Sequence, residues 1–225
     1  MKNNSVVITG SSKGIGLATA TKFLSSGFIV HGIDLRQGTI QHKNYIHHRV
    51  DITEYGNLPD IDNVNYLINN AGIQSNDISV IDTNLIALIK ITEKYGLQPN
   101  IKSIVNVGSV SAHTGEEFPW YAASKGGVLP YTKAIANEIA KYGATCNSIS
   151  PGGVLTELNQ SVIDDKDCWS KIMEVTPLKK WASAEEISEW IYFMSVVNES
   201  MTGQDIIIDN GEMINSKFVW KDEEN

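Results

Sequence analysis

The chain has 225 residues, of which 42% are hydrophobic and 20% are charged, a balance typical of a globular protein with a sizeable buried core. Its formal net charge of −8 argues against nucleic acid or an anionic membrane as the main partner. Two cysteines without a metal-ligand spacing, an amino terminus that runs straight into a strand, and the lack of an apolar run of roughly 20 residues predict a cytoplasmic protein with no signal peptide, metal site or membrane span.

Short apolar runs alternate with helical stretches along the chain. We expect strands at Ser5–Thr9, Ile29–Ile33, Tyr45–Val50, Tyr66–Asn69, Ser103–Val107, Thr145–Ile149 and Asp205–Ile208. Helices are expected near residues 15–26, 80–98, 120–142, 155–174 and 183–197. Because several strands are continuously apolar, they are expected to be covered on both faces. The alternation predicts one α/β domain, residues 1–225, with a doubly wound parallel sheet of about seven strands and a frayed acidic tail at 222–225.

The first expected strand runs into a glycine-rich turn, Thr9-Gly10-Ser11-Ser12-Lys13-Gly14-Ile15-Gly16, which opens a helix. A strand that breaks into glycines and restarts as a helix is typical of a phosphate-binding turn, because free N–H groups and the positive end of the helix dipole meet there. The standard G-x-G-x-x-G spacing is absent. A tight turn without a ligand is the alternative interpretation of this segment alone.

Carboxylate and amide side chains follow the next strands. Asp34 ends the second strand, about 20 residues beyond the glycines, where a carboxylate accepts hydrogen bonds from adenosine ribose hydroxyls and repels a 2′-phosphate. Lys13 and Arg36 favour the opposite preference, since a cation can hold that phosphate. Asp51 follows the third strand, and Asn69-Asn70-Ala71-Gly72 ends the fourth. Each of these two segments either contacts a cofactor or forms an ordinary turn without a ligand.

A serine, a tyrosine and a lysine form the most informative set. Ser109 follows the strand Ser103–Val107, and Tyr121 lies four residues before Lys125, so the last two share a helix face. A cation beside a phenol stabilises the phenolate and lowers its pKa, which lets the phenol exchange a proton with a carbonyl or alcohol near neutral pH. A partly buried tyrosine and a surface lysine are the alternative for an isolated Tyr-x-x-x-Lys.

Taken together, these motifs resemble the short-chain dehydrogenase/reductase family over nearly the whole chain. The resemblance continues through Asn84, Asn147–Gly152, Thr156 and Thr202-Gly203-Gln204. It implies a Rossmann-type fold, with Tyr121 as catalytic acid/base and Lys125 as the residue that binds the nicotinamide ribose and lowers the tyrosine pKa. It further implies that Ser109 holds the substrate oxygen and that Asn84 positions a water for proton relay, with Ser111 as the alternative to Ser109.

The resemblance also implies a nicotinamide dinucleotide and an oligomer. Besides Tyr121 and Lys125, the implied cofactor-binding residues are Gly10, Ser12, Lys13, Gly14, Ile15, Gly16, Asp34, Leu35, Asp51, Ile52, Asn70, Ala71, Gly72, Pro151, Gly152, Val154 and Thr156. Asp34 favours NAD(H), with NADP(H) as the alternative. The helix that carries Tyr121 resembles the family's main oligomer helix, which implies a homodimer or homotetramer.

Four segments depart from the family pattern, and the smallest departure is Asp209-Asn210-Gly211, where two glycines are common. Ser109 precedes Tyr121 by 12 residues, one fewer than usual. The connection 53–65 is too short for a comfortable crossover helix, since a βαβ connection needs about 10–12 residues or more and a glycine and a proline interrupt it. Residues 72–83 are also trimmed. The flank of the cleft is therefore altered more than the dinucleotide half.

The sequence thus predicts a short-chain oxidoreductase that transfers hydride between NAD(P)(H) and a carbonyl or secondary alcohol. Two alternatives stay open. One is an NADPH-linked 3-oxoacyl reductase, and the other is an NAD(H)-binding sensor or scaffold that has lost turnover. Substrate specificity is expected to lie in the loops 73–83, 113–120 and 155–175.

Overall fold

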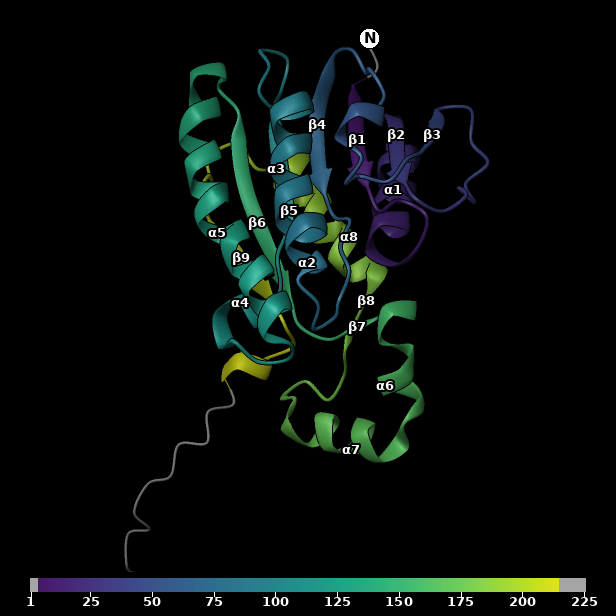
Figure 1. Cartoon of the computed structure of the whole chain (residues 1–225), viewed down its shortest axis with the longest axis vertical. Coiled ribbons are helices and arrows are strands. Elements are labelled where there is room, and N and C mark those ends of the chain that lie inside the picture. The colour runs from purple at the N-terminus through teal and green to yellow at the C-terminus, as the bar shows by residue number, and fades with distance from the viewer. Residues whose placement is uncertain (1–3, 215–225) are drawn as a thin grey trace, which may run out of the picture.

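A computed structural model of the chain describes residues 4–214, so the predicted acidic tail at 222–225 lies outside the described residues. Seven parallel strands form the central sheet, in the spatial order β3-β2-β1-β4-β5-β6-β9 (Figure 1). Their bounds are β1 Ser5–Thr9, β2 Ile29–Asp34, β3 Tyr45–Arg49, β4 Val64–Asn69, β5 Ser103–Val107, β6 Thr145–Pro151 and β9 Asp205–Ile208. The order reverses between β1 and β4, as in a doubly wound dinucleotide fold, and the predicted fold class is confirmed.

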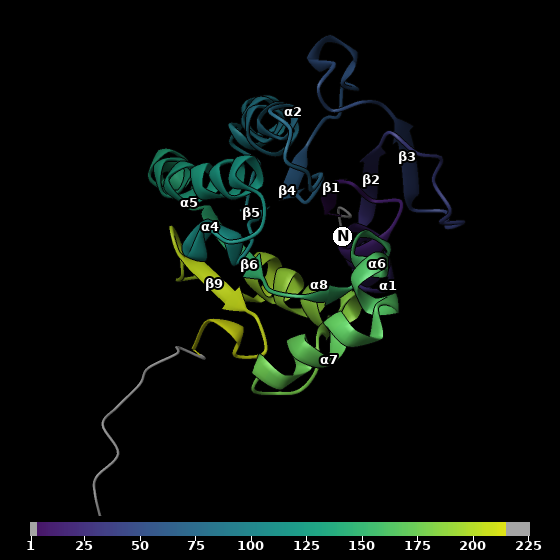
Figure 2. The same cartoon turned by 60° about the horizontal axis from the view of Figure 1, so that its bottom comes forward.

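Helices cover both faces of the sheet, as Figure 2 shows. Helices α1 (Gly14–Ser25) and α8 (Ala184–Tyr192) pack on one face, where Phe23, Val30 and Ile187 are buried in one core cluster. A continuous helical run covers the other face, made of α2 (Ser79–Ile81), the π-helical turn Asp82–Ile86, α3 (Ala87–Ile91) and the π-helical turn Thr92–Gly96. Helix α5 (Pro119–Ile139) lies beside this run, and α4 (Ser111–Thr114) precedes α5.

The region predicted as one helix over residues 155–174 is divided, which corrects that prediction. The chain forms the short strand β7 (Val154–Leu155), a 3-10 turn (Glu157–Asn159), α6 (Gln160–Asp164) and α7 (Lys166–Val175). The division has a local cause, because the Asp165 carboxylate accepts hydrogen bonds from the amides of Asp167 and Cys168 and so starts a new helix. Strand β7 pairs with β8 (Ala182–Ser183) in a small second sheet that the sequence did not indicate.

Helix α8 begins as its sequence predicts. The Ser183 hydroxyl accepts from the amide of Glu186, and the Glu186 carboxylate accepts from the amide of Ser183. A π-helical turn, Phe193–Val197, extends α8, and further 3-10 turns lie at Ala140–Tyr142 and Glu212–Ile214. Within residues 4–214, no helix has the combined length and apolar character required to cross a membrane.

The structure describes every residue of the connection between β3 and β4. The only regular element in this connection is a 3-10 turn, Tyr55–Asn57. The short connection therefore leaves part of the sheet face thinly covered. His31 on β2 pairs in register with Ile46 on β3, whose side chain is 43% exposed. On the same face His31 and His48 stack, with Nδ1 of His31 and Nε2 of His48 3.2 Å apart.

This histidine pair predicts a loss of stability in mild acid. Burial lowers the pKa of His31 and of His48. Repulsion from His48 lowers the pKa of His31 further, and repulsion from His47 lowers that of His48 further. As the pH falls below the ordinary histidine value of about 6.5, the unfolded chain binds protons that the folded chain does not, so the free energy of unfolding decreases. Urea unfolding of His48→Gln at neutral and mildly acidic pH is expected to show a smaller decrease than the wild type.

The exposed His42, in the loop before β3, provides the matched control for this measurement. His42→Gln is expected to keep the wild-type dependence of stability on pH. An unchanged dependence in His48→Gln would contradict the assignment of this acid sensitivity to the stacked pair.

Candidate active site

The glycine-rich turn connects β1 to α1 at the carboxyl edge of the sheet. Gly10 and Gly14 have φ values of +69° and +51°, which favour glycine. A Cβ on Gly10 would lie 2.9 Å from Cα of Ala71, and one on Gly16 would lie 2.0 Å from the carbonyl oxygen of Gly10. The glycines therefore bring the start of α1 close to β1 and β4, and Gly14 and Ile15 of this 12-residue helix line a cavity at that edge.

Asp34 is fixed in place by two backbone amides. Its Oδ2 accepts from the amide of Ser12 at 2.9 Å, and its Oδ1 accepts from the amide of Arg36 at 2.8 Å. The residue is only 8% exposed. The carboxylate thus joins the glycine-rich turn to the loop after β2, with its charge at the cavity wall.

A chain of side-chain hydrogen bonds connects the same two segments. The hydroxyls of Ser11 and Tyr45 are 3.0 Å apart, the Tyr45 hydroxyl is 3.3 Å from Nδ1 of His47, and Nε2 of His47 is 2.9 Å from the carbonyl oxygen of Arg36. Since the carbonyl can only accept, Nε2 carries the proton and Nδ1 accepts from Tyr45. Gly32 leaves room for this chain, because its Cβ would lie 2.3 Å from the Tyr45 hydroxyl.

Removing the middle of this chain is expected to weaken the binding of a dinucleotide cofactor. Tyr45→Phe leaves Ser11 and His47 without their shared partner and loosens the turn and the Arg36 loop relative to each other. A hydrogen bond of this kind is worth about 0.5–1.5 kcal/mol, so the dissociation constant for NADH should rise about two- to tenfold. Fluorescence titration measures it. Tyr142→Phe, which alters a partly buried tyrosine remote from the cavity, should leave it unchanged.

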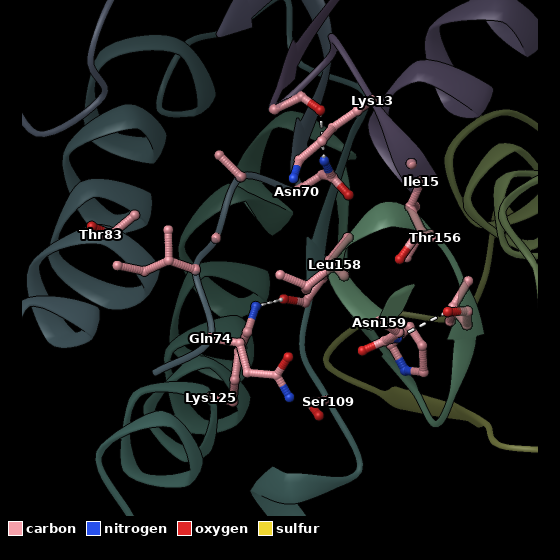
Figure 3. A pocket seen from close by; sticks show the side chains of 18 of the residues that line it. Lys13, Ile15, Asn70, Gln74, Thr83, Ser109, Lys125, Thr156, Leu158 and Asn159 are labelled. Carbon is pink, nitrogen blue, oxygen red and sulfur yellow. Dashed lines mark hydrogen bonds between the residues drawn. The ribbon is translucent and has the colours of Figure 1, made fainter. Parts of the chain in front are cut away.

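One cavity of about 730 Å³ runs from the glycine-rich turn to the catalytic set predicted from the sequence. Figure 3 shows Lys13, Ile15 and Asn70 toward one end and Ser109 and Lys125 toward the other. All predicted catalytic and cofactor-binding residues line this cavity except Ser12, Gly16 and Asn84. Ser12 and Gly16 shape the wall from behind, through the amide bond to Asp34 and the close approach of α1.

The wall of the cavity is continuous, and glycines occupy the positions where its backbone segments come closest to one another. A wall of this kind fits an extended nucleotide. The cavity joins the fixed Asp34 carboxylate, the amides at the start of α1 and the Tyr121 phenol in one space. The residues present therefore fit a nicotinamide dinucleotide. In the described part of the chain, no group of three or more His, Cys, Asp or Glu side chains could hold a metal ion.

Tyr121 and Lys125 lie one turn apart on α5, and both line the cavity. The Lys125 ammonium is buried, donates to the carbonyl oxygen of Val107 at 2.8 Å, and lies 6.0 Å from the centre of the Tyr121 ring. Burial lowers the pKa of Lys125 to about 8. The geometry therefore brings the two groups together beside the end of β5, as their spacing predicts.

The predicted lowering of the tyrosine pKa requires correction. Burial raises the pKa of Tyr121 to about 12, a hydrogen bond from Ser109 opposes the rise, and the negative charge of Glu117 adds to it. The physical reason is that desolvation disfavours the phenolate, while Lys125 is directed at a backbone carbonyl rather than at the phenol oxygen. At neutral pH the phenol is therefore protonated and able to donate.

Ser109, not Ser111, is the serine that lines the cavity beside Tyr121. The Ser109 hydroxyl accepts from the amide of Ser111 at 3.1 Å and lies 3.2 Å from the Ser111 hydroxyl. Ser111 is 1% exposed, and its hydroxyl donates to Oε2 of Glu117 at 2.7 Å. Ser111 thus supports Ser109 and Glu117 from behind the wall.

Asn84 lies in the π-helical turn Asp82–Ile86, is buried, and is not part of the cavity wall. Its amide group donates to the carbonyl oxygen of Ile73 at 2.9 Å and to the Ser124 hydroxyl at 3.0 Å, and its Oδ1 accepts from the amide of Ile73. A Cβ on Gly72 would lie 3.1 Å from Oδ1 of Asn84 and 3.5 Å from Nζ of Lys125. Asn84 therefore joins α5 to the loop after β4 close to Lys125.

Glu117, Trp181 and Glu212 are among the cavity-lining residues that sequence reasoning did not single out. Trp181 lies before β8, and its ring meets Trp169 of α7 edge to face, with centroids 5.0 Å apart. Glu117 falls in the loop expected to set specificity, but no motif distinguished it. Glu212 carried no signal, since only the fold brings residues after β9 to this edge of the sheet.

Comparison with known proteins agrees with this geometry. A family model described as enoyl-(acyl carrier protein) reductase matches residues 59–212. The chain is 29% identical to a 3-oxoacyl-[acyl-carrier-protein] reductase FabG of Chlamydia pneumoniae, over 92% of this chain and 95% of that protein. The structure is similar to a 4-hydroxyisoleucine dehydrogenase complexed with NADH, with a TM-score of 0.85, 28% identity, and coverage of 94% of this chain and 99% of that one.

A second similar structure is ElxO with NADP bound, with a TM-score of 0.84, 25% identity, and coverage of 94% of this chain and 99% of that one. The family model covers more than half of the chain, and the relatives named above match it nearly end to end. The sheet order and the cavity from Gly10 to Tyr121 agree with this match. The chain therefore belongs to the short-chain dehydrogenase/reductase family and is an NAD(P)-linked oxidoreductase.

Proposed function

We propose that this oxidoreductase interconverts a carbonyl compound and a secondary alcohol, with Tyr121 as the acid/base and NAD(H) as the preferred cofactor. The observation that carries the proposal is the cavity in which Ser109, Tyr121 and Lys125 face the same space as the fixed carboxylate of Asp34. A bound nicotinamide cofactor supplies or accepts the hydride. The side chains of this protein bind and orient the reactants and move the proton.

In the direction of reduction, the carbonyl carbon receives the hydride and its oxygen receives the proton of the Tyr121 phenol. Ser109 donates a hydrogen bond to the same oxygen, which stabilises the negative charge that develops there. Lys125 is the group that would hold the ribose hydroxyls next to the nicotinamide. A phenol whose burial raises its pKa to about 12 favours this direction at neutral pH, because it carries the proton to be donated.

The preference for NAD(H) rests on Asp34. Its two oxygens are held by the amides of Ser12 and Arg36, so the carboxylate can accept from ribose hydroxyls without moving. The same charge would repel a 2′-phosphate. Lys13 and Arg36 also line the cavity and are the residues that would favour NADP(H).

A second candidate is the reduction of a 3-oxoacyl thioester with NADPH, which is favoured by the similarity to the Chlamydia pneumoniae enzyme over nearly the whole chain. A screen of ketones, secondary alcohols and an acetoacetyl thioester, with both cofactors and detection by nicotinamide absorbance, distinguishes the two candidates. Cofactor binding without turnover of any compound would instead favour a sensor or scaffold.

A homodimer or homotetramer in the cytoplasm completes the proposal. Helix α5 supports the oligomer. It is the long helix at the molecular surface that carries Tyr121 and Lys125, and it resembles the family's oligomer helix. The acidic composition and the two free cysteines support the compartment. Light scattering of the purified protein measures the oligomeric state.

A further inference from the structure

A chain of hydroxyl groups leads from the catalytic set to the surface of the protein. The Ser109 hydroxyl, in the cavity wall, donates to the Ser111 hydroxyl at 3.2 Å, and the Ser111 hydroxyl donates to Oε2 of Glu117 at 2.7 Å. Ser109 and Ser111 are 7% and 1% exposed, whereas Glu117 is an exposed residue. The chain therefore begins beside the reacting groups and ends at a carboxylate that water can reach.

The carboxylate sets the direction of the hydrogen bonds in this chain. An ionised carboxylate only accepts, so the single hydrogen of the Ser111 hydroxyl is committed to Glu117. The Ser111 oxygen then accepts the hydrogen of Ser109, whose own oxygen also accepts from the amide of Ser111 at 3.1 Å. One lone pair of Ser109 remains for a hydroxyl in the cavity. A hydroxyl that accepts on one side and donates on the other can pass a proton on without becoming charged.

Tyr121 is the cavity hydroxyl next to Ser109. Both side chains line the same cavity, and the hydrogen bond between them opposes the burial that raises the pKa of the phenol. The other polar groups of the catalytic set are directed inward, since Lys125 donates to the carbonyl oxygen of Val107 and Asn84 donates both amide hydrogens within the protein. The serine chain instead leads outward, and it stays in place when a cofactor and a substrate fill the cavity.

The backbone of Glu117 is an independent sign that this carboxylate has a task. Its φ is +71°, in the left-handed region that residues with a Cβ rarely adopt and that glycine adopts readily. Strained residues of this kind persist where the surrounding structure holds them, and they gather at functional sites. The loop between α4 and α5 thus keeps a carboxylate on Ser111 where local conformation alone favours a glycine.

We infer that Ser109, Ser111 and Glu117 form a proton relay that exchanges the proton of Tyr121 with solvent during turnover. The inference rests on the proposed function, because it describes how the proposed acid/base is reset after each reaction. Ser111 and Glu117 act through Ser109 and do not touch the substrate. They are therefore positioning residues of the relay, and Ser109 is its contact with the reacting groups.

Each step of the relay forms one O–H bond and breaks another. In alcohol oxidation, Tyr121 has taken the substrate proton and must lose it before the next turnover. The phenol proton passes to the oxygen of Ser109, the Ser109 proton passes to Ser111, and the Ser111 proton passes to Glu117, which gives it to water. Each serine gains one proton and loses one, so one proton reaches solvent and no electron is transferred. Carbonyl reduction uses the same bonds in reverse.

Oxidation of the most active secondary alcohol of the screen with NAD⁺, in weakly buffered solution at neutral pH, tests the relay. Glu117→Gln keeps the size of the side chain but cannot take up the proton, and Ser111→Ala removes the middle hydroxyl. Each is expected to lower kcat about tenfold, less than the hundred- to ten-thousand-fold that a group in contact with the reacting atoms contributes. The double variant should be no slower than the slower single variant, because an interrupted chain loses nothing further.

Chemical rescue by formate separates a relay from a structural role. Glu117→Gly removes the carboxylate and keeps the loop, because glycine adopts the positive φ without strain. Sodium formate then supplies a carboxylate in solution, and kcat should rise toward the wild-type value as its concentration increases, whereas sodium chloride should have no such effect. Ser111→Ala should recover little, because the gap that it leaves is buried.

Glu116→Gln is the matched control, because Glu116 is the exposed neighbour of Glu117 and lies outside the described cavity wall. It should keep the wild-type kcat with and without formate.

The outcomes distinguish failure of the relay from failure of the proposed function. A wild-type kcat in either Glu117→Gln or Ser111→Ala overturns the relay and leaves Tyr121 as the proposed acid/base. A loss of kcat in Glu117→Gly that formate does not restore also overturns the relay, since the carboxylate would then only support the loop. Full turnover by Tyr121→Phe, or a lack of nicotinamide-linked turnover with every compound of the screen, overturns the relay and the proposed reaction together.

Discussion

Replacement of Tyr121 with phenylalanine is expected to lower kcat about a hundred- to ten-thousand-fold, the range that a positioned acid or base contributes. The substitution removes only the hydroxyl that shares a hydrogen bond with Ser109 and keeps the ring that fills the cavity wall. Binding of NADH should therefore stay near the wild-type value. Steady-state rates with a substrate from the screen, together with a fluorescence titration of NADH, measure the two quantities separately.

Tyr131 provides the matched control, because it lies on the same helix and its side chain is outside the described cavity wall. Tyr131→Phe should keep kcat within about twofold of the wild type, since the loss of a partly buried hydroxyl away from the reacting atoms alters stability more than chemistry. Full turnover by Tyr121→Phe would refute the assignment of Tyr121 as the acid/base. Another group would then have to move the proton, while the oxidoreductase assignment would stand.

The raised pKa of Tyr121 also gives the direction of the pH dependence. The phenol is protonated at neutral pH and loses its proton only as the pH approaches about 12. Alcohol oxidation, which requires the phenolate, is therefore expected to accelerate as the pH rises from neutral. Carbonyl reduction, which requires the phenol, should not gain from the same increase. Rates in both directions across that pH range measure the difference.

Neutralising Asp34 should change the cofactor preference. Asp34→Asn removes the charge that would repel a 2′-phosphate and one of the oxygens held by the amides of Ser12 and Arg36. Since hydrogen bonds to charged groups are worth about 1.5–3 kcal/mol, NADH affinity should fall about ten- to a hundredfold. NADPH affinity should rise, because Lys13 and Arg36 are then unopposed. Titrations with both cofactors measure the ratio.

Asp62→Asn is the charge-matched control for this experiment, since Asp62 is an exposed aspartate outside the described cavity wall. It should leave the ratio of the two dissociation constants unchanged. An Asp34→Asn protein that keeps the wild-type ratio would show that another feature sets the preference. Tighter NADPH than NADH binding by the wild type would contradict the NAD(H) preference itself.

The histidine pair and the divided helix show where sequence patterns lose information. The pattern over residues 155–174 is apolar at helical intervals but does not reveal the break. From the sequence alone, an aspartate that caps a new helix, as Asp165 does, looks the same as an aspartate on the surface of a continuous helix. The stacking of His31 on His48 depends on the register of β2 and β3, which the sequence does not state. In both cases long-range packing selects one of several locally acceptable conformations.

The sequence by itself determined the sheet, the phosphate-type turn and the Tyr121–Lys125 pair. These depend on local rules, namely runs of apolar residues, glycines at positive φ, and two side chains one helical turn apart. Only the tertiary structure decided the state of the phenol and which distant side chains share the cavity wall with it. Burial raised the pKa of Tyr121 against expectation, and the crossovers of a parallel sheet brought Glu117 and Glu212, 95 residues apart in the chain, into the wall of the same cavity.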